Sequence, residues 1–174
     1  MARGPARSLV LGYAAIAAML GGSLWLLFGT RDILPRGLRP LVEAAAARHG
    51  LDAGLVEAVV RAESRGDPEA VSRRGACGLM QLTLPTAADV AGRTVTMAEL
   101  FDPATNLDLG CRYLKMLLNR YPSDLRLALM AYNAGLGTVD RWLREEPDPD
   151  GILARLAYRE TRGYVEKVLG YLRG

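Results

Sequence analysis

The stretch Val59–Asp67, "VVRAESRGD", places a glutamate on the apolar side of a predicted helix. Successive residues of an α-helix are about 100° apart around its axis, so one apolar arc is formed by Leu55, Val56, Val59, Val60 and Ala62. Glu63 falls near the middle of that arc, and Gly66 and Pro68 end the helix just beyond it. We therefore expect Glu63 to point toward the inside of the domain.

An inward-pointing glutamate has a definite chemical consequence. Burial and the negative end of a helix dipole both disfavour the carboxylate, so an unpaired Glu63 is expected to stay protonated. A carboxylic acid that is neutral near pH 7 is what a general acid in glycoside cleavage requires. The alternative is a helix-end glutamate that forms a salt bridge with Arg65 or Arg73.

The residues after position 40 form a succession of predicted helices. Asp52 and Asp102-Pro103 are typical helix starts. No segment alternates polar and apolar residues as a strand does, which predicts an all-α domain with at most a small hairpin. A Gly-, Ser- and Pro-rich segment at 67–84 is expected to be a structured loop with a short helical piece near 79–81. The expected helices cover 41–49, 52–65, 85–91, 97–100, 103–120, 124–132, 138–145 and 152–172.

The N-terminal region has a different character, because Leu9–Phe28 contains 20 residues without a charge. This is the length that a helix needs to cross the hydrocarbon core of a bilayer. We expect an uncleaved anchor, because Trp25–Phe28 continues the apolar run where a signal peptide would end in a small-x-small site. A cleavable signal peptide and a buried helix of a soluble core are the alternatives. The expected organisation is a cytoplasmic tail (1–8), a transmembrane anchor (9–28), a linker (29–40) and a helical domain (41–174).

The charge distribution indicates no nucleic-acid partner. The net charge of +3 comes entirely from the first 31 residues, which hold three arginines and no acidic residue. In the rest of the chain 19 basic residues are balanced by 19 acidic ones. A nucleic-acid-binding protein needs a concentrated basic face, and the sequence provides none.

Two cysteines, Cys77 and Cys111, lie in separate segments. In an oxidising compartment they can pair as a disulfide; otherwise they are buried thiols that pack as small apolar side chains. Together with the single histidine, His49, they lack the spacing of metal ligands. We expect no metal site and no cofactor.

Three motifs occur in the order that characterises a known family. Glu63-Ser64 is followed by "AVSRRGACGLMQ" at Ala70–Gln81 and by "AYNAG" at Ala131–Gly135. With the closing stretch "RETRGYVEKVLGY" at Arg159–Tyr171, these motifs resemble the lysozyme-like lytic transglycosylases, the soluble-lytic-transglycosylase catalytic family. The similarity extends over residues 51–171. It implies the all-α, lysozyme-like fold that this family shares with goose-type lysozymes.

The resemblance assigns an expected role to each matching residue. Glu63 is the expected catalytic acid/base, and Tyr164 is expected to orient it or pack beside it. Each other residue has a structural alternative, such as core packing for Met80 or a backbone-bonding amide for Gln81. Every tyrosine outside residues 9–28 lies after residue 100, which predicts that the far wall of the groove comes from the C-terminal half. The expected substrate-binding residues are Ser72, Met80, Gln81, Tyr132, Asn133 and Tyr164.

Two small departures from the family pattern concern loops. The proline that usually follows the second motif is displaced by one residue, to Pro85, and Leu136 stands where the family commonly has proline. Neither residue is expected to touch a reacting atom.

The resemblance also implies a reaction that needs only one carboxylate. Glu63 would protonate the oxygen between N-acetylmuramic acid and N-acetylglucosamine, and would then deprotonate the muramic C6 hydroxyl, which closes on C1. The product is a 1,6-anhydro sugar. Ordinary glycosidases use two carboxylates, but the nearby Asp67 and Glu69 are expected on the surface. The alternatives are a goose-type-lysozyme-like hydrolase and a non-catalytic glycan-binding scaffold.

These expectations suggest where the protein works. Peptidoglycan strands are the expected partner, and the N-terminal helix would hold the protein in the cytoplasmic membrane as a single-pass protein. The catalytic domain would then lie in the periplasm or outside the cell. No protein partner can be named from the sequence.

Overall fold

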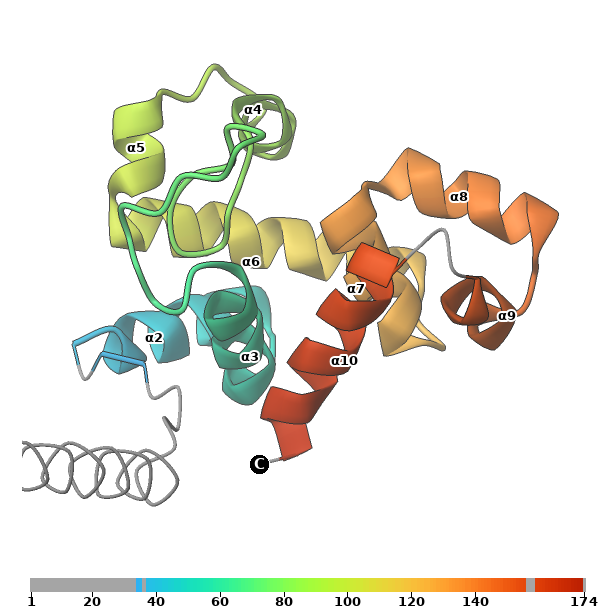
Figure 1. The fold of residues 1–174 in the computed structure, drawn as a ribbon. Helices are drawn as coiled ribbons and strands as arrows, with labels where there is room; N and C mark the ends of the chain where they lie inside the picture. Colours follow the sequence, from blue (N-terminus) through green and yellow to red (C-terminus); the bar gives the residue numbers. More distant parts are fainter. Residues whose placement is uncertain (1–33, 36, 156–158, 174) are drawn as a thin grey trace, which may run out of the picture. The chain divides into compact units, whose positions relative to one another are not determined.

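The computed structural model describes residues 34–35, 37–155 and 159–173, and its regular elements there are all α-helices (Figure 1). Two isolated bridges, Val71 with Cys77 and Cys77 with Leu82, form a small hairpin-like loop. The predicted all-α class is therefore confirmed. The helices are α2 (Arg39–His49), α3 (Ala53–Glu63), α4 (Leu84–Ala91), α5 (Met97–Phe101), α6 (Pro103–Arg120), α7 (Leu125–Ala134), α8 (Leu136–Glu145), α9 (Pro149–Ala154) and α10 (Arg159–Arg173).

Side-chain caps explain where many of these helices begin. Asp52 accepts a hydrogen bond from the backbone N–H of Leu55 at 2.9 Å, and Asp102 accepts one from Thr105 at 2.8 Å. Thr96 forms a reciprocal capping box with Glu99 at the start of α5. Each such cap satisfies backbone donors that have no partner within the helix and is worth about 1 kcal/mol.

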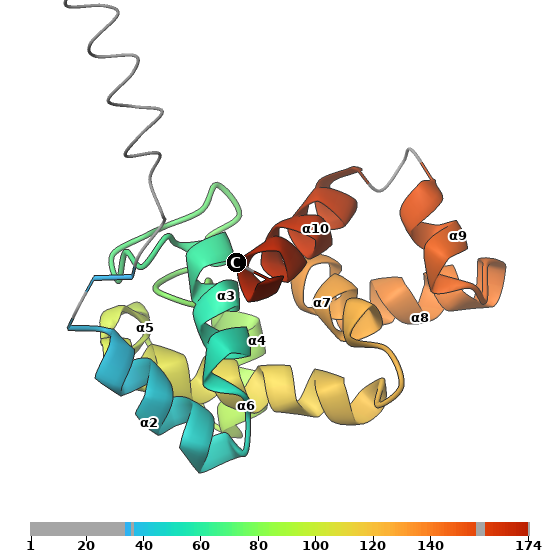
Figure 2. The ribbon, with the colours of Figure 1, turned by 90° about the horizontal axis from the view of Figure 1, so that it is seen from below.

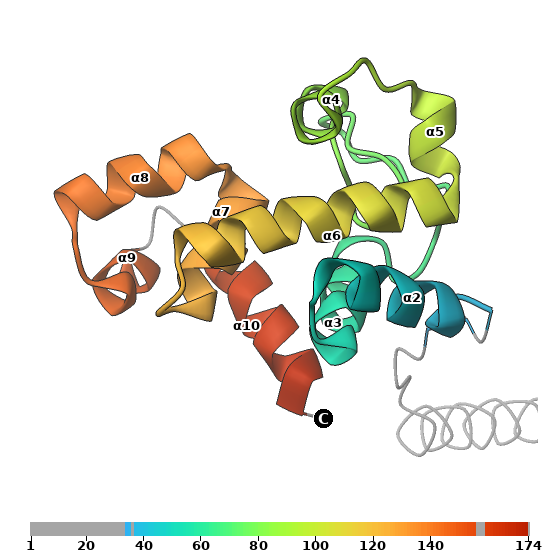
Figure 3. The same cartoon turned by 180° about the vertical axis from the view of Figure 1, so that it is seen from behind.

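Helix α6 is the central element of the described domain. In Figures 1 and 3, α4 and α5 lie on one side of it and α2 and α3 on the other. At one end α6 packs against α7, and α10 lies against both α3 and α7, as Figure 2 also shows. Its buried residues occur on several faces, which lets it contribute to two apolar clusters. The arrangement brings the end of α3 and the start of α10 to the same region.

The loop between α3 and α4 is held in place by a buried asparagine. Asn106 of α6 is fully buried, accepts a hydrogen bond from Met80 N (2.8 Å), and donates to the carbonyl oxygens of Cys77 (3.0 Å) and Leu100 (2.7 Å). Gly78 adopts a positive φ of 75°, and a Cβ there would lie 2.3 Å from Asn106 and from the Leu100 carbonyl. The Asn106 side chain therefore provides backbone hydrogen bonds that neighbouring strands would provide in a β-sheet.

The domain begins before the predicted boundary at residue 41. Leu34 and Leu38 are buried in the main apolar cluster, and α2 already starts at Arg39. The last residues of the predicted linker are thus part of the packed domain. The predicted anchor, residues 9–28, lies outside the described residues. Within the described ranges, no helix is both long and apolar enough to cross a membrane.

The structure does not contain the disulfide that the sequence allowed. Both cysteines are free and fully buried. Cys111 packs in the main cluster, whereas Cys77 packs with Leu82 in the smaller cluster beside α4 and α5. Burial raises the pKa of the Cys111 thiol to about 12, so this side chain behaves as an apolar group.

Candidate active site

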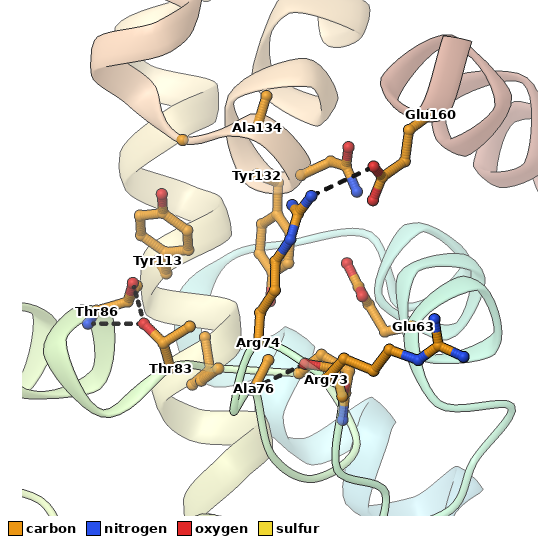
Figure 4. A pocket seen from close by; sticks show the side chains of 15 residues that line it. Glu63, Arg73, Arg74, Ala76, Thr83, Thr86, Tyr113, Tyr132, Ala134 and Glu160 are labelled. Carbon is orange, nitrogen blue, oxygen red and sulfur yellow. Dashed lines mark hydrogen bonds and ion pairs between the residues drawn. The ribbon is translucent and has the colours of Figure 1, made fainter. Parts of the chain in front are cut away.

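A groove of about 580 Å³ opens beside the C-terminal end of α3 (Figure 4). One wall is formed by the loop that follows α3 and by the start of α4. The other is formed by α6, the end of α7 and the start of α10. The residues that line it are Glu63, Ser72, Arg73, Arg74, Ala76, Gln81, Leu82, Thr83, Thr86, Tyr113, Tyr132, Asn133, Ala134, Gly135 and Glu160.

Glu63 is the last residue of α3, and most of its side chain is surrounded by protein while a part faces the groove. Removal from water raises the pKa of Glu63 from 4.5 to about 7; the Tyr164 hydroxyl and the charge of Lys167 lower it by smaller amounts. Among the described residues, no ion pair within 4 Å joins Glu63 to Arg65 or Arg73. The alternative of a helix-end glutamate that forms a salt bridge with Arg65 or Arg73 is therefore wrong. With a pKa of about 7, Glu63 populates both its protonated and its ionised form near neutral pH.

Ser64 fixes the position of Glu63 at the helix end. Its hydroxyl donates to the Leu79 carbonyl at 2.8 Å and accepts from Gly66 N at 3.1 Å, so it joins the end of α3 to the following loop. Arg65 takes a positive φ of 57° directly afterwards, which turns the chain away from the helix axis. The Glu-Ser pair thus combines a groove-facing acid with the residue that anchors it.

Two buried tyrosines flank the acid. Tyr132 donates a hydrogen bond to the Met80 carbonyl at 2.9 Å. The Tyr164 hydroxyl is buried and close enough to lower the pKa of Glu63, but it forms no hydrogen bond of normal geometry within the described structure. Burial, followed by the charge of Glu63, raises the pKa of both phenols well above their ordinary value. Both side chains therefore remain neutral beside Glu63, and of the two only the Tyr164 hydroxyl has a proton that is not already donated to another group.

Three more of the predicted binding residues line the groove and also shape it. The Ser72 hydroxyl accepts a hydrogen bond from Ala76 N at 3.0 Å, which closes a tight turn. Gln81 has a positive φ of 48°, and its amide nitrogen donates to two backbone carbonyls of the same loop. Asn133 accepts from Thr161 at 2.9 Å, which joins α7 to α10. These polar side chains face the groove while part of their hydrogen-bonding capacity is already used.

The prediction that Met80 lines the groove is wrong. Its side chain is fully buried and packs so closely against Gly110 of α6 that a Cβ there would lie 2.3 Å from the sulfur. Only its backbone serves the site, through the hydrogen bond from Tyr132. Tyr164 likewise lies behind Glu63 rather than among the lining residues. Both side chains shape the site from the protein interior.

Three charged residues of the groove, Arg73, Arg74 and Glu160, were not among the site residues expected from the sequence. Arg74 reaches from the loop past Tyr132 and forms an ion pair with Glu160 of α10 at 3.5 Å (Figure 4). Arg73 leaves the same turn in another direction. The adjacent arginines inside the second motif and the acid that opens the closing stretch were the available signals. Tyr113, whose ring centroid is 5.2 Å from that of Tyr132, belongs to the tyrosine wall expected from the C-terminal half.

This arrangement can transfer protons to and from a bound sugar. Aromatic faces, amides and hydroxyls are the groups that bind neutral sugars, and one acid of raised pKa stands among them. Asp67 and Glu69 are exposed and are not lining residues. Across the described ranges, no group of three or more His, Cys, Asp or Glu side chains is arranged to hold a metal ion.

The comparisons of this chain with known proteins agree on one family. The Transglycosylase SLT domain family matches residues 40–154. Membrane-bound lytic murein transglycosylase C of Actinobacillus succinogenes is 35% identical, over 67% of this chain and 36% of the relative. The 70 kDa soluble lytic transglycosylase of Escherichia coli has a solved structure with a TM-score of 0.74 and 30% identity, covering 90% of this chain and 26% of that one.

A third similar protein is the lytic transglycosylase Slt of Pseudomonas aeruginosa, whose structure was solved as an inactive glutamate-to-glutamine mutant. It has a TM-score of 0.69 and 32% identity, and the match covers 77% of this chain and 23% of that chain. The chain spans 25–36% of the length of the curated relatives that it matches. On the match over residues 40–154, the chain belongs to the Transglycosylase SLT domain family.

Proposed function

We propose that this protein is a peptidoglycan lytic transglycosylase in which Glu63 is the single acid/base. The observation that carries the proposal is a groove-facing carboxyl whose pKa is about 7, in a groove that polar, aromatic and charged side chains line. The names of the relatives, which are lytic murein transglycosylases, support the substrate. The inactive glutamate-to-glutamine mutant of the Pseudomonas protein supports the dependence on one glutamate.

The proposed reaction uses the two protonation states of Glu63 in succession. The protonated acid donates its proton to the oxygen between N-acetylmuramic acid and N-acetylglucosamine as the bond to C1 breaks. The acetamido group of the muramic residue supports the positive charge at C1. The Glu63 carboxylate then accepts the proton of the C6 hydroxyl, whose oxygen bonds to C1. The acid is regenerated and no water is consumed.

The substrate would contact the walls on both sides of Glu63. Ser72, Gln81 and Asn133 can bond to sugar hydroxyls and acetamido groups, and the half-buried ring of Tyr113 can stack on a pyranose face. Tyr164 would act through Glu63, by donating to its carboxylate when that form appears. Cleavage within strands or from their ends would depend on how far this groove extends beside a bound glycan.

A hydrolase is the second candidate, because Glu160 lines the same groove as Glu63. A second carboxylate is what a hydrolase would use to activate water. Against this role, the Glu160 side chain is 73% exposed and its carboxylate lies against the Arg74 guanidinium. Purified peptidoglycan should be digested by the wild type, Glu63→Gln and Glu160→Gln, and the fragments weighed. The proposal expects 1,6-anhydro ends from the wild type and Glu160→Gln, and a loss of about 10³-fold or more with Glu63→Gln.

Two other outcomes would contradict the transglycosylase. Fragments heavier by one water would indicate a hydrolase, and their disappearance with Glu160→Gln would identify the second carboxylate. A third possibility, the glycan-binding scaffold, predicts that Glu63→Gln leaves the cellular role of the protein intact. Undiminished cleavage by Glu63→Gln would remove the basis of the proposed mechanism.

We further propose that residues 9–28 anchor the protein in the cytoplasmic membrane, after a cytoplasmic tail at 1–8. The catalytic domain would then face the periplasm or the cell exterior, where peptidoglycan lies. The uncharged run of 20 residues supports this arrangement. The membrane-bound relative from Actinobacillus is consistent with such a location.

A further inference from the structure

Two arginines stand in a groove whose other binding groups suit a neutral sugar. Arg73 and Arg74 both line it and both are exposed. Neutral hexoses are held by aromatic faces, amides and hydroxyls, and they carry no negative charge that forms an ion pair with a guanidinium. An arginine presents its donors in a planar fork that matches a carboxylate. The charge of the two arginines therefore finds no partner on a neutral sugar ring, whereas a carboxylate would provide one.

The turn that carries the arginines is rigid. Ser72 and Ala76 exchange hydrogen bonds, with Ser72 N donating to the Ala76 carbonyl at 2.9 Å and Ala76 N donating to the Ser72 hydroxyl at 3.0 Å. Gly75 N closes the turn on the Ser72 carbonyl at 3.0 Å. Because the backbone is pinned, only side-chain freedom is lost when an arginine binds a ligand. A turn with an ordered backbone is well suited to present an arginine side chain to a ligand.

Arg74 already holds a carboxylate, in the form of Glu160. The two side chains are 80% and 73% exposed and 3.5 Å apart, and they meet across the groove (Figure 4). Exposed ion pairs are weak, because water solvates both partners and their side chains lose freedom. Arg73 forms no ion pair or hydrogen bond among the described residues. A carboxylate on a ligand can thus replace Glu160 on Arg74, while Arg73, whose side chain leaves the same turn in another direction, adds a second positive charge to the groove.

We propose that Arg74 binds a carboxylate carried by the muramic residues of the glycan, with Arg73 adding positive charge to the same groove, and that Glu160 occupies this position until the glycan arrives. The inference rests on the proposed function, because it takes peptidoglycan as the substrate. Two sources of the carboxylate share this chemistry. One is the lactyl group, which is free when the peptide is absent; the other is the stem peptide, which carries its own carboxylates when present.

Binding to the full-length Glu63→Gln protein, which isolates recognition from cleavage, tests the proposal. Three probes are titrated by calorimetry: a neutral N-acetylglucosamine oligomer, a peptide-free peptidoglycan oligomer and a peptide-bearing one. Adding Arg74→Gln and Arg73→Gln together should weaken binding of a carboxylate-bearing oligomer by about tenfold and leave the neutral oligomer within about twofold. Glu160→Gln should strengthen binding of the same oligomer, because it removes the competing carboxylate.

Arg39→Gln is the matched control. Arg39 is also exposed and forms an ion pair of similar length, 3.6 Å with Glu57, but it does not line the groove. Arg39→Gln removes one exposed positive charge outside the groove, where the double variant removes two inside it, and it should change none of the three affinities. The effect of the double variant should also shrink as the salt concentration rises, since solvent-exposed charges are screened.

The three probes distinguish the two sources of the carboxylate, and they also show which results would overturn the proposal. A loss confined to the peptide-free oligomer assigns the carboxylate to the lactyl group, and a loss confined to the peptide-bearing oligomer assigns it to the stem. Equal losses for all three probes, or none for either acidic probe, overturn the proposal. A failure of the proposed function would be seen in a different experiment. The wild type would then release no anhydro products from peptidoglycan, regardless of these binding affinities.

Discussion

The chemistry of the site depends on the environment of one side chain. Glu63 ends a helix whose buried residues pack in the main core, and removal from water holds its pKa at about 7. Lys167 opposes this effect; its ammonium group donates to the Ala62 carbonyl at 2.8 Å, next to the acid. The resulting balance leaves the acid able both to give and to accept a proton near neutral pH.

The first prediction concerns the pH dependence of cleavage. Bond cleavage needs protonated Glu63, so kcat/KM measured from initial rates of anhydro-product release should fall as pH rises through about 7. Lys167→Met removes a positive charge that lowers this pKa, and it should move the fall to higher pH. Lys167→Arg keeps the charge and should restore the wild-type profile. A profile that is flat between pH 6 and 9 in the wild type would contradict the role of Glu63.

The second prediction concerns stability. The pKa of Glu63 rises from 4.5 to about 7 on folding, so the folded state binds more protons than the unfolded state between these values. Stability from this group is therefore lost as pH rises through that window. Because part of the side chain faces the groove, Glu63→Gln should raise the free energy of unfolding by only about 1–3 kcal/mol at pH 8, with little change at pH 4.

Denaturant unfolding at the two pH values measures the effect. Glu69→Gln provides the control, because Glu69 is exposed and outside the groove. A Glu63→Gln protein that is less stable than the wild type at pH 8 would show that the ionised carboxylate is well paired, contrary to this account.

At the scale of elements, the loop between α3 and α4 decides the geometry of the groove. This loop carries Ser72, Arg74 and Gln81, yet it has almost no regular structure of its own. Its backbone is held by Asn106, whose amide satisfies one donor and two acceptors in the protein interior. A buried polar group of this kind is costly to remove, because its partners remain buried without it.

The third prediction compares two glycines of this loop. Gly78→Ala combines a positive φ with a Cβ 2.3 Å from Asn106 and from the Leu100 carbonyl, and it should cost about 3 kcal/mol or more. Gly75 has nearly the same φ, 77°, but its Cβ would meet open space, so Gly75→Ala should cost only about 1 kcal/mol. Thermal unfolding measures both. Equal losses would mean that backbone conformation, and not the contact with Asn106, limits this position.

At the scale of the whole molecule, the N-terminal region differs in composition from the rest of the chain. It carries the net positive charge and a long apolar run, whereas the remaining residues are balanced in charge. The fourth prediction follows from this division. The full chain should remain in the membrane fraction after washing with high salt or alkaline carbonate, whereas a chain lacking residues 1–28 should not. Substitution of Leu20 by Arg within the full chain is the matched control, because one charge at the bilayer centre weakens insertion. Release of the unaltered chain by either wash would contradict the anchor.

The sequence by itself determined the helical class, the positions of most helix starts and the inward direction of Glu63. These properties are local, because capping residues and a 3.6-residue period act within a few turns of chain. Ser72, Gln81, Tyr132 and Asn133 were also found in advance, through motifs that resemble a family, and they line the groove.

Only the tertiary structure decided which side chains face the groove and which lie behind it. Met80 turned inward because Gly110 leaves room for it on α6, and Cys77 and Cys111 packed in different clusters. Arg74 met Glu160, 86 positions away in the sequence, because α10 returns to lie beside α3. No local pattern encodes such meetings, since they depend on how distant helices pack and on the space that their side chains leave.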